Sequence, residues 1–364
     1  MKTVHDNCGI FAVYAQGPCA FTIYQGIDFL QHRGQQYCGI ATYDGGVQQI
    51  THHGKVINNF TDQDLENLPG HWGIGHVSLW ERQPVKWQSL RGEIAVAFSG
   101  SIINDQELKI VLVNGSGFTT VKQLPSPRRA HCAFEWAYTA SIDSIIEGLP
   151  VLAARQQLGA ALAQRDQEER GLMADMVAPV PMSGIGHALG YHLHSRLPYQ
   201  EVFLYNRYAH RSYTQATQVA REKMAKRKLS VLHYAVRGKS ILLCDDSIVR
   251  GTQILNKVND LKKAGAKAVH VRVACPPLMY PCDFGISTRT FAVRMARHYL
   301  YQGDIDSLAA LRQLEGWVAA QIGADSVKYS SPENFVAALG LPRQDLCLKC
   351  WDGRRPQDGP QAQP

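Results

Sequence analysis

The chain has 364 residues, of which 45% are apolar and 19% are charged, and it carries a formal net charge of +7. This length exceeds what one hydrophobic core usually supports and predicts two domains. The composition excludes a mostly disordered, collagen-like or coiled-coil chain, and no apolar run approaches the ~20 residues of a membrane-spanning helix. Because residues 1–7 contain no apolar signal-peptide core, we expect a cytoplasmic protein without membrane association.

The positive charge is compatible with nucleic acid or with a small polyphosphate substrate. Lys and Arg residues are spread along the chain, and the densest group, in residues 221–228, has no interleaved aromatic side chain. A solvated helix face explains this group, so nucleic-acid binding is not expected.

The first part of the chain has the pattern of short strands separated by turns. Residues 9–14 and 94–98 are rich in apolar and aromatic side chains and predict strands, and residues 23–31 predict a helix. Residues 125–127, a Pro-Ser-Pro sequence, form the candidate linker. A domain boundary is therefore expected close to residue 127.

The second part alternates helices and strands. Helices are predicted over 151–165, 184–193 and 253–264, and strands over 176–180, 240–244 and 269–273. The segment 240–244 is a nearly continuous apolar run, as parallel strands buried on both faces are. Strand, helix and strand at this spacing predict a parallel sheet with flanking helices.

Two adjacent carboxylates, Asp245 and Asp246, end the buried strand at 240–244, and a loop of small and hydroxyl residues then opens the next helix. In open α/β sheets, ligands bind beyond the carboxyl ends of the strands. Free N–H groups at a helix start suit a phosphate, while the carboxylates suit vicinal hydroxyls or a cation beside it. A sugar phosphate satisfies both halves of the pattern, and a solvated Asp-Asp turn is the structural alternative.

Residues 241–252 resemble the phosphoribosyl-pyrophosphate (PRPP) motif of type I phosphoribosyltransferases, and more narrowly that of the glutamine-dependent amidophosphoribosyltransferases. Residues 180–184 resemble that family's pyrophosphate loop, with Met182 where an Asp is common, and residues 205–213 resemble its flexible loop. The resemblance is nearly continuous from residue 132 to about residue 350. It implies the type I phosphoribosyltransferase fold, an α/β parallel sheet with flanking helices.

The resemblance also implies a chemistry. Mg²⁺ would bridge pyrophosphate and ribose oxygens and take up leaving-group charge, Arg211 would add donors to the pyrophosphate, and ammonia would attack C1. Closure of the flexible loop would exclude water. The residues implied to contact PRPP are Asp245, Asp246, Ser247, Ile248, Val249, Arg250, Gly251, Thr252, Ser183, Asn206, Arg207, Arg221 and Lys228. Those implied to hold Mg²⁺, largely through PRPP, are Ser183, Asp245 and Asp246.

The N-terminal part resembles a class II glutamine amidotransferase of the N-terminal-nucleophile type. Cys8 occupies the nucleophile position, which would require cleavage after Asn7, and the strings at 31–36, 39–41 and 75–77 also resemble this family.

The glutamine contacts of that family are not matched. Ser78 stands where the family has the Arg that holds the substrate carboxylate, and Ser99 where it has an oxyanion-hole Asn. An oxyanion hole that lacks one donor costs ~2.7–4 kcal/mol of barrier. Residues 118–121 run into the linker and reach Cys132 almost at once, so the second half of such a domain is predicted to be absent. We therefore expect a truncated α+β domain with an inactive glutaminase, whose uncovered strand faces are covered by the transferase domain or by a second subunit of a homo-oligomer.

The nine cysteines are an odd number in an expected cytosolic context, so a disulfide framework is not predicted. Cys347 and Cys350 form a C-x-x-C, which by itself is ambiguous among zinc, redox and cluster roles. With Cys132 and Cys282 there are four thiols, a set that suits tetrahedral zinc or an iron–sulfur cluster. The strings around all four resemble the ligand positions of the iron–sulfur amidophosphoribosyltransferases, which favours a [4Fe–4S] cluster; zinc and four unrelated buried thiols are the alternatives.

The predicted organisation is therefore a truncated amidotransferase-like domain over 8–127, a phosphoribosyltransferase domain over 128–290, a C-terminal helical segment over 291–352 and a disordered tail over 353–364. The predicted product is 5-phosphoribosylamine, made from PRPP and ammonia, with the ammonia free or supplied by a separate partner, as in purine biosynthesis. Two alternatives remain. Another amine or a base could be the acceptor, because the flexible loop departs from the family, or the chain could be a non-catalytic PRPP sensor or scaffold.

Overall fold

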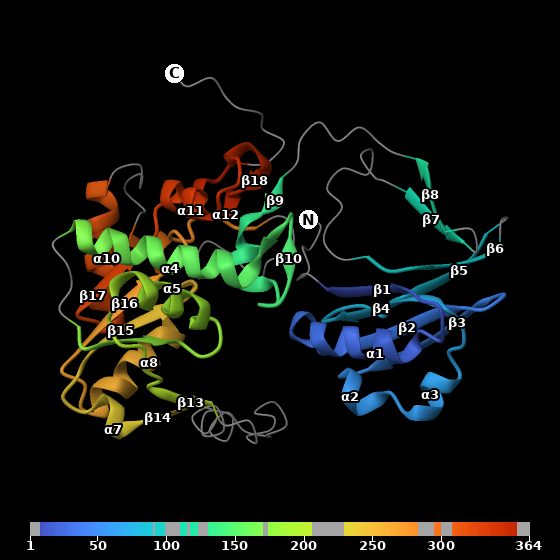
Figure 1. Cartoon of the computed structure of the whole chain (residues 1–364), viewed down its shortest axis with the longest axis horizontal. Coiled ribbons are helices and arrows are strands. Elements are labelled where there is room, and N and C mark those ends of the chain that lie inside the picture. Colours follow the sequence, from blue (N-terminus) through green and yellow to red (C-terminus); the bar gives the residue numbers. More distant parts are fainter. Residues whose placement is uncertain are drawn as a thin grey trace. The chain divides into compact units, whose positions relative to one another are not determined.

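The structure is a computed structural model that describes residues 8–89, 92–98, 110–114, 117–122, 130–169, 174–205, 229–282, 295–299 and 308–354. The chain divides into two compact units, Met1–Pro125 with Cys282–Arg289 and Ser126–Pro281 with Thr290–Pro364 (Figure 1). The candidate linker at 125–127 and most of the predicted tail lie outside the described residues. In the described part of the chain, no helix is long and apolar enough to cross a membrane.

The first unit is built on an antiparallel four-stranded sheet of order β1-β4-β2-β3. These strands are β1 (Gly9–Tyr14), β2 (Tyr37–Tyr43), β3 (Val47–His53) and β4 (Trp72–Ser78). Helix α1 (Ala20–Phe29) buries Ile23 and Ile27 against this sheet. The approach requires Gly75 on β4, because a Cβ there would lie 2.5 Å from a side-chain carbon of each isoleucine.

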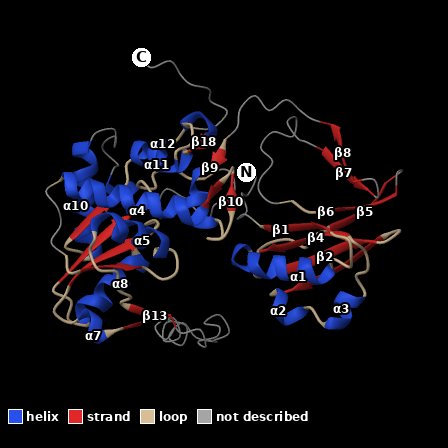
Figure 2. Cartoon of the chain, viewed as in Figure 1, coloured by secondary structure: helices blue, strands red, loops and turns tan. Residues whose placement is uncertain are grey.

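Short elements complete the first unit, as Figure 2 shows. They are the 3-10 turn η1 (Leu30–Arg33), helices α2 (Val56–Asn59) and α3 (Asp62–Glu66), and the hairpin strands β5 (Val85–Ser89), β6 (Gly92–Val96), β7 (Ile110–Asn114) and β8 (Gly117–Lys122). The strand predicted over 94–98 lies instead at 92–96. Strand β6 ends at Val96 because Val96 pairs with Val85, the first residue of β5. The residue before Val85 is Pro84, which has no N–H group that could extend the pairing.

The second unit is built on a parallel sheet of order β12-β15-β16-β17, so the predicted parallel sheet is confirmed. Its strands are β12 (Met176–Pro179), β15 (Ser240–Asp245), β16 (Ala268–Val273) and β17 (Ser326–Tyr329), and its long helices are α4 (Val151–Glu168), α5 (Ile185–Ser195), α8 (Thr252–Lys263) and α10 (Leu308–Ile322). The predicted helices are confirmed to within three residues at each end.

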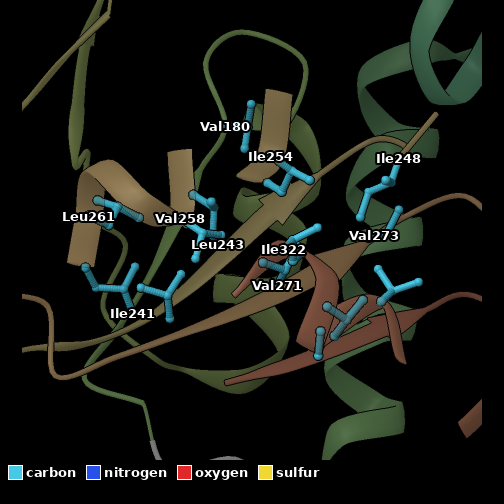
Figure 3. Packing of buried hydrophobic residues seen from close by; sticks show 14 of the residues in the cluster. Val180, Ile241, Leu243, Ile248, Ile254, Val258, Leu261, Val271, Val273 and Ile322 are labelled. Carbon is cyan, nitrogen blue, oxygen red and sulfur yellow. The ribbon is translucent and has the colours of Figure 1, made fainter. Parts of the chain in front are cut away.

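Alternate residues of these strands face opposite sides of the sheet. Ile241, Leu243 and Val271 join one apolar core with residues of α8 and α10, such as Val258 and Ile322 (Figure 3). All five side chains are fully buried. Dispersion and the burial of apolar surface therefore stabilise the packing of these helices on this side of the sheet.

The other side of the sheet carries a buried charge network. Asp166 on α4 accepts hydrogen bonds from Arg272 Nε on β16 at 2.6 Å and from the Tyr191 hydroxyl on α5 at 2.7 Å, and it pairs with Lys328 Nζ on β17 at 2.7 Å. Arg165 on the same helix pairs with Glu315 on α10 at 2.6 Å. These bonds join α4 to α5 and α10 and to the strands β16 and β17.

Several smaller elements belong to the second unit. They are β9 (His131–Cys132), the π-helical turn η2 (Glu135–Thr139), β10 (Ile145–Ile146), β11 (Leu149–Pro150), β13 (Phe203–Tyr205), β14 (Leu229–Val231), α7 (His233–Val236), α9 (Met295–Tyr299), α11 (Pro332–Leu339), the 3-10 turn η5 (Arg343–Asp345), β18 (Leu346–Cys347) and α12 (Lys349–Asp352). Strand β9 pairs in parallel with β18, so the C-terminal part of the described chain is joined to the start of the unit.

Acid should destabilise the first unit through His76. This residue of β4 is fully buried, and burial lowers the pKa of its imidazole to about 4. Since the unfolded chain takes up that proton near pH 6.5, the free energy of unfolding should fall as pH drops from about 6.5 to 4, by roughly 3 kcal/mol from this group. In His76→Asn, the thermal midpoint should depend less on pH over this range than in the parent chain. His71→Asn, at an exposed position, is the control, and equal pH dependence in both variants would contradict the assignment.

Candidate active site

The two carboxylates lie at the carboxyl end of β15, where the sequence predicts a ligand site. Asp245 and Asp246 are 7% and 4% exposed. Asp245 Oδ1 accepts hydrogen bonds from Ser183 Oγ at 3.2 Å and from the Asp246 N–H at 3.0 Å, and Asp246 Oδ2 accepts one from Ser247 Oγ at 2.5 Å. The two backbone carbonyls accept from the N–H groups of Ala274 and Cys275. Both acids are therefore fixed in place by the fold.

The pair is electrostatically unfavourable without a ligand. Burial raises the pKa of the Asp245 carboxyl well above its usual range, and the neighbouring charge of Asp246 raises it further. Such buried like-charged pairs are typical of functional sites, because a cation or hydrogen-bond donors from a substrate relieve the repulsion.

The loop after the pair leads directly into α8. Ile248 is buried and anchors the loop, while Arg250 and Thr252 are exposed. Gly251 has φ of +76° at the N-cap of the helix, a conformation that favours glycine. The first backbone N–H groups of α8 have no partner within the helix, so they can donate to an anion.

The predicted pyrophosphate loop at 180–184 lies against the same strand end. The N–H of Val180 donates to the carbonyl of Cys244 at 2.8 Å, and a Cβ on Gly184 would come within 2.2 Å of that carbonyl oxygen. Met182 is 66% exposed and supplies no carboxylate. The structure thus brings together Ser183, the acid pair and the loop 247–252.

The remaining predicted PRPP contacts lie outside the described residues. They are Asn206, Arg207, Arg211, Arg221 and Lys228. The oxygen donors that are described, from Ser183 and the two acids, are of the type that Mg²⁺ takes, since this ion commonly uses one or two carboxylates plus substrate phosphates. The donor set therefore fits Mg²⁺.

Two residues near the acid pair were missed by the sequence analysis. Arg155 on α4 and His187 on α5 are buried, and the charge of Asp246 acts on both. A polar side chain inside a helical stripe of buried apolar residues, as Arg155 is between Val151 and Leu158, is a sequence signal that could have found the first.

In the first unit, Cys8 directly precedes β1, and Ser78 ends the neighbouring strand β4. Cys8, 5% exposed, immediately precedes Gly9, which is the register partner of Val77, and Ser78 immediately follows Val77. The Ser78 hydroxyl donates to the carbonyl of Glu81 and accepts from its N–H. A neutral hydroxyl used in this way does not replace a guanidinium that binds a carboxylate. Residues 99–101 are outside the described part.

The predicted cysteine ligands divide between the units. Cys132 is the register partner of Cys347. Cys350 lies three residues later, in α12, and its carbonyl accepts from the N–H groups of Met279 and Tyr280. Cys282 is grouped with the first unit. Within the ranges that the structure describes, no three His, Cys, Asp or Glu side chains are arranged to hold a metal ion. The backbone thus brings three cysteines into one region, while the side chains as they stand form no metal centre.

Comparisons with known proteins agree with this architecture. No family model matches the chain. An amidophosphoribosyltransferase from Methanothermobacter thermautotrophicus is 30% identical, with 97% of this chain and 95% of the relative covered, and one from Bacillus subtilis is 26% identical, with 98% and 96% covered. The solved glutamine PRPP amidotransferase from B. subtilis, a complex with ADP and GMP, aligns with a TM-score of 0.78 and 25% identity over 96% of this chain and 98% of that one.

These comparisons also identify a difference in length. The alignment with the archaeal relative runs over 469 positions, whereas this chain has 364 residues, so at least 105 positions of the relative have no counterpart here.

The predicted fold class, an N-terminal-nucleophile-type α+β domain followed by a type I phosphoribosyltransferase domain, is confirmed. With 30% identity over almost the whole of both chains, the protein belongs to the amidophosphoribosyltransferase family.

Proposed function

We propose that this chain makes 5-phosphoribosylamine from PRPP and ammonia, as a step of purine biosynthesis or of a related pathway. The observation that carries this proposal is the buried pair Asp245 and Asp246, joined to Ser183 and followed by the open N-terminus of α8. A sugar carrying a phosphate and a pyrophosphate matches this order of groups.

Each described element has a part in the reaction. The N–H groups at the start of α8 bind the 5-phosphate, and the two carboxylates accept hydrogen bonds from the ribose hydroxyls and favour the positive charge that develops at C1. Ser183 and its loop orient the pyrophosphate. Ser183, Asp245 and Asp246 would hold Mg²⁺, largely through PRPP, and the ion would neutralise charge on the leaving group. Arg211, Asn206, Arg207, Arg221 and Lys228 are proposed to contact PRPP, with Arg211 adding donors to the pyrophosphate, and the loop 205–213 is proposed to close over it.

The proposed nitrogen source is ammonia from solution or from a separate partner protein. Ser78 uses its hydroxyl within its own loop and carries no charge for a glutamine carboxylate. The archaeal relative also has at least 105 positions without a counterpart in this chain, which supports the proposal that part of the domain is absent. Cys8 therefore remains as a buried residue of a remnant domain, and cleavage after Asn7 is not needed for the reaction.

The four cysteines are proposed to bind a [4Fe–4S] cluster, which would tie the C-terminal segment to the transferase domain. The pairing of Cys132 with Cys347 supports this, and Cys282 comes two residues after Tyr280, whose N–H binds the carbonyl of Cys350. Anaerobically purified protein should contain about four iron and four sulfide per chain, and Cys347→Ser should lose both. Cys19→Ser is the matched control. One zinc per chain and no iron would contradict the cluster.

We also propose that the amidotransferase-like domain spans 8–127, the transferase domain 128–290, the C-terminal segment 291–352 and the tail 353–364. The chain is proposed to form a homo-oligomer that covers the remnant domain, and to be cytoplasmic. The antiparallel sheet of the first unit and the parallel sheet of the second support the first boundary. Sedimentation velocity on the full chain tests the oligomer.

Pyrophosphate release tests the proposed function. With PRPP and Mg²⁺, release should depend on ammonium and should not be increased by glutamine. Release with glutamine alone would contradict the assignment of Ser78. No release with either, together with measured PRPP binding, would favour a different acceptor or a PRPP sensor.

A further inference from the structure

The π-helical turn η2 ends in carbonyl groups that two buried side chains bind. A helix end leaves its last carbonyls without partners inside the helix. Arg155, 5% exposed, donates from Nε to the carbonyl of Trp136 at 3.0 Å and from Nη2 to those of Tyr138 and Ala140 at 2.9 and 2.8 Å. The guanidinium is thus used as a fork on backbone oxygens rather than on a carboxylate.

His187 lies against the carbonyl of Ala137, which Arg155 does not bind. Its Nε2 lies 3.1 Å from the oxygen of Ala137, and its Nδ1 lies 3.1 Å from the carbonyl oxygen of Arg155 itself. The ring is fully buried, and burial lowers its pKa to about 4, so at neutral pH it donates one hydrogen bond. The ring of His187 on α5 therefore lies between a carbonyl of η2 and a carbonyl of α4, and its single N–H donates to one of the two.

Helices α4 and α5 also approach one another very closely there. A Cβ on Gly159 of α4 would lie 1.9 Å from the carbonyl oxygen of His187, and one on Gly186 of α5 would lie 2.8 Å from Cβ of Arg155. Such contact leaves little freedom for either side chain, so the position of η2 depends on both.

The acid pair acts electrostatically on one end of this arrangement and is hydrogen-bonded to the loop that precedes the other. Tyr138 on η2 is half-exposed, and its hydroxyl pKa is raised by burial and by the charges of Asp246 and Asp245. At the other end, α5 begins directly after the loop whose Ser183 donates to Asp245. The π-helical turn is a geometry often found at functional sites.

We propose that Arg155 and His187 are positioning residues that hold η2, with Tyr138, against the first turn of α5 and so fix both sides of the acid pair for PRPP. This inference rests on the proposed function for its link to PRPP, but not for the geometry. Neither side chain is proposed to contact substrate. They act through the backbone of η2 and through the loop that carries Ser183.

The experiment compares His187→Ala and His187→Gln with a matched control, His192→Ala. His192 lies on the same helix and also binds a backbone carbonyl, that of Leu197, but at the far end of α5. We expect His187→Ala to lower kcat/KM for PRPP at least tenfold, and His187→Gln, which keeps one donor, to regain most of that loss. His192→Ala should stay within twofold of the parent chain.

A second readout does not need activity. In the full chain labelled with 3-fluorotyrosine, the ¹⁹F resonance of Tyr138, assigned with Tyr138→Phe, should shift in His187→Ala and in Arg155→Lys but not in His192→Ala. The proposal would be overturned by an unmoved Tyr138 resonance in His187→Ala, or by equal losses of kcat/KM in His187→Ala and His192→Ala. If the parent chain releases no pyrophosphate, the proposed function fails, and the resonance still decides the positioning role.

Discussion

Asp245→Asn is expected to lower the rate of pyrophosphate release from PRPP by about 100- to 1,000-fold, the usual effect of removing one preorganised electrostatic group. The same variant should be more stable than the parent chain at neutral pH. Burial and the charge of Asp246 raise the pKa of Asp245. When folding raises the pKa of a carboxyl, the protein's free energy of unfolding falls as pH rises above the unfolded pKa of that group. Replacing the carboxyl by an amide eliminates that decrease.

The measurement is the thermal midpoint of the metal-free protein at pH 5 and pH 8, together with the rate of pyrophosphate release. Asn keeps the shape of the side chain and can still accept from Ser183. Asp260→Asn, at an exposed position of α8, is the matched control and should change neither quantity. Activity within threefold of the parent chain, or a lower midpoint at pH 8, would contradict the role of Asp245.

Asp166→Ala is expected to lower the free energy of unfolding by about 3–5 kcal/mol, the range found when one partner of a buried ion pair is removed. The substitution leaves Arg272, 1% exposed, without the carboxylate that accepts from its Nε and Nη2 at 2.6 and 2.9 Å. It also removes the acceptor of the Tyr191 hydroxyl. Burial alone would raise the pKa of Asp166, but the hydrogen bond and charge of Arg272 hold it below its usual value.

Urea unfolding of the full chain measures this effect. Glu168→Ala is the control, because Glu168 lies two residues further along α4, at an exposed position, and should change the free energy of unfolding by less than about 1 kcal/mol. A loss in Asp166→Ala no larger than that of the control would contradict the network. Because the pKa of Asp166 is lowered on folding, its contribution should be present at neutral pH and should be lost as pH falls below 4.

The parts of the fold that depend on local pattern could be predicted from the sequence. The apolar run at 240–244 identified a buried parallel strand, and the amphipathic spacing from 253 to 264 identified α8 to within one residue. The acid pair at the strand end was also visible, because a βαβ unit fixes where a strand's carboxyl end must lie.

The parts that depend on distant partners could not be predicted. Asp166 and Arg272 are 106 residues apart, and Arg165 and Glu315 are 150 apart, so no periodic pattern connects them. The role of His187 depends on the carbonyl of Ala137, a group that every residue has, so its side chain gives no signal in the sequence. The strand predicted at 94–98 was displaced because its end is fixed by pairing with β5, not by its own composition.

A competition between labelled ammonium and glutamine identifies the source of the nitrogen at C1. The chain is given PRPP, Mg²⁺, ¹⁵N-ammonium and unlabelled glutamine together, and the mass of the phosphoribosylamine is measured as it forms. The product should carry ¹⁵N in proportion to the ammonium supplied, whatever the glutamine concentration. Product that carries unlabelled nitrogen from glutamine would show a working glutaminase in this chain and would overturn the assignment of ammonia as the nitrogen source.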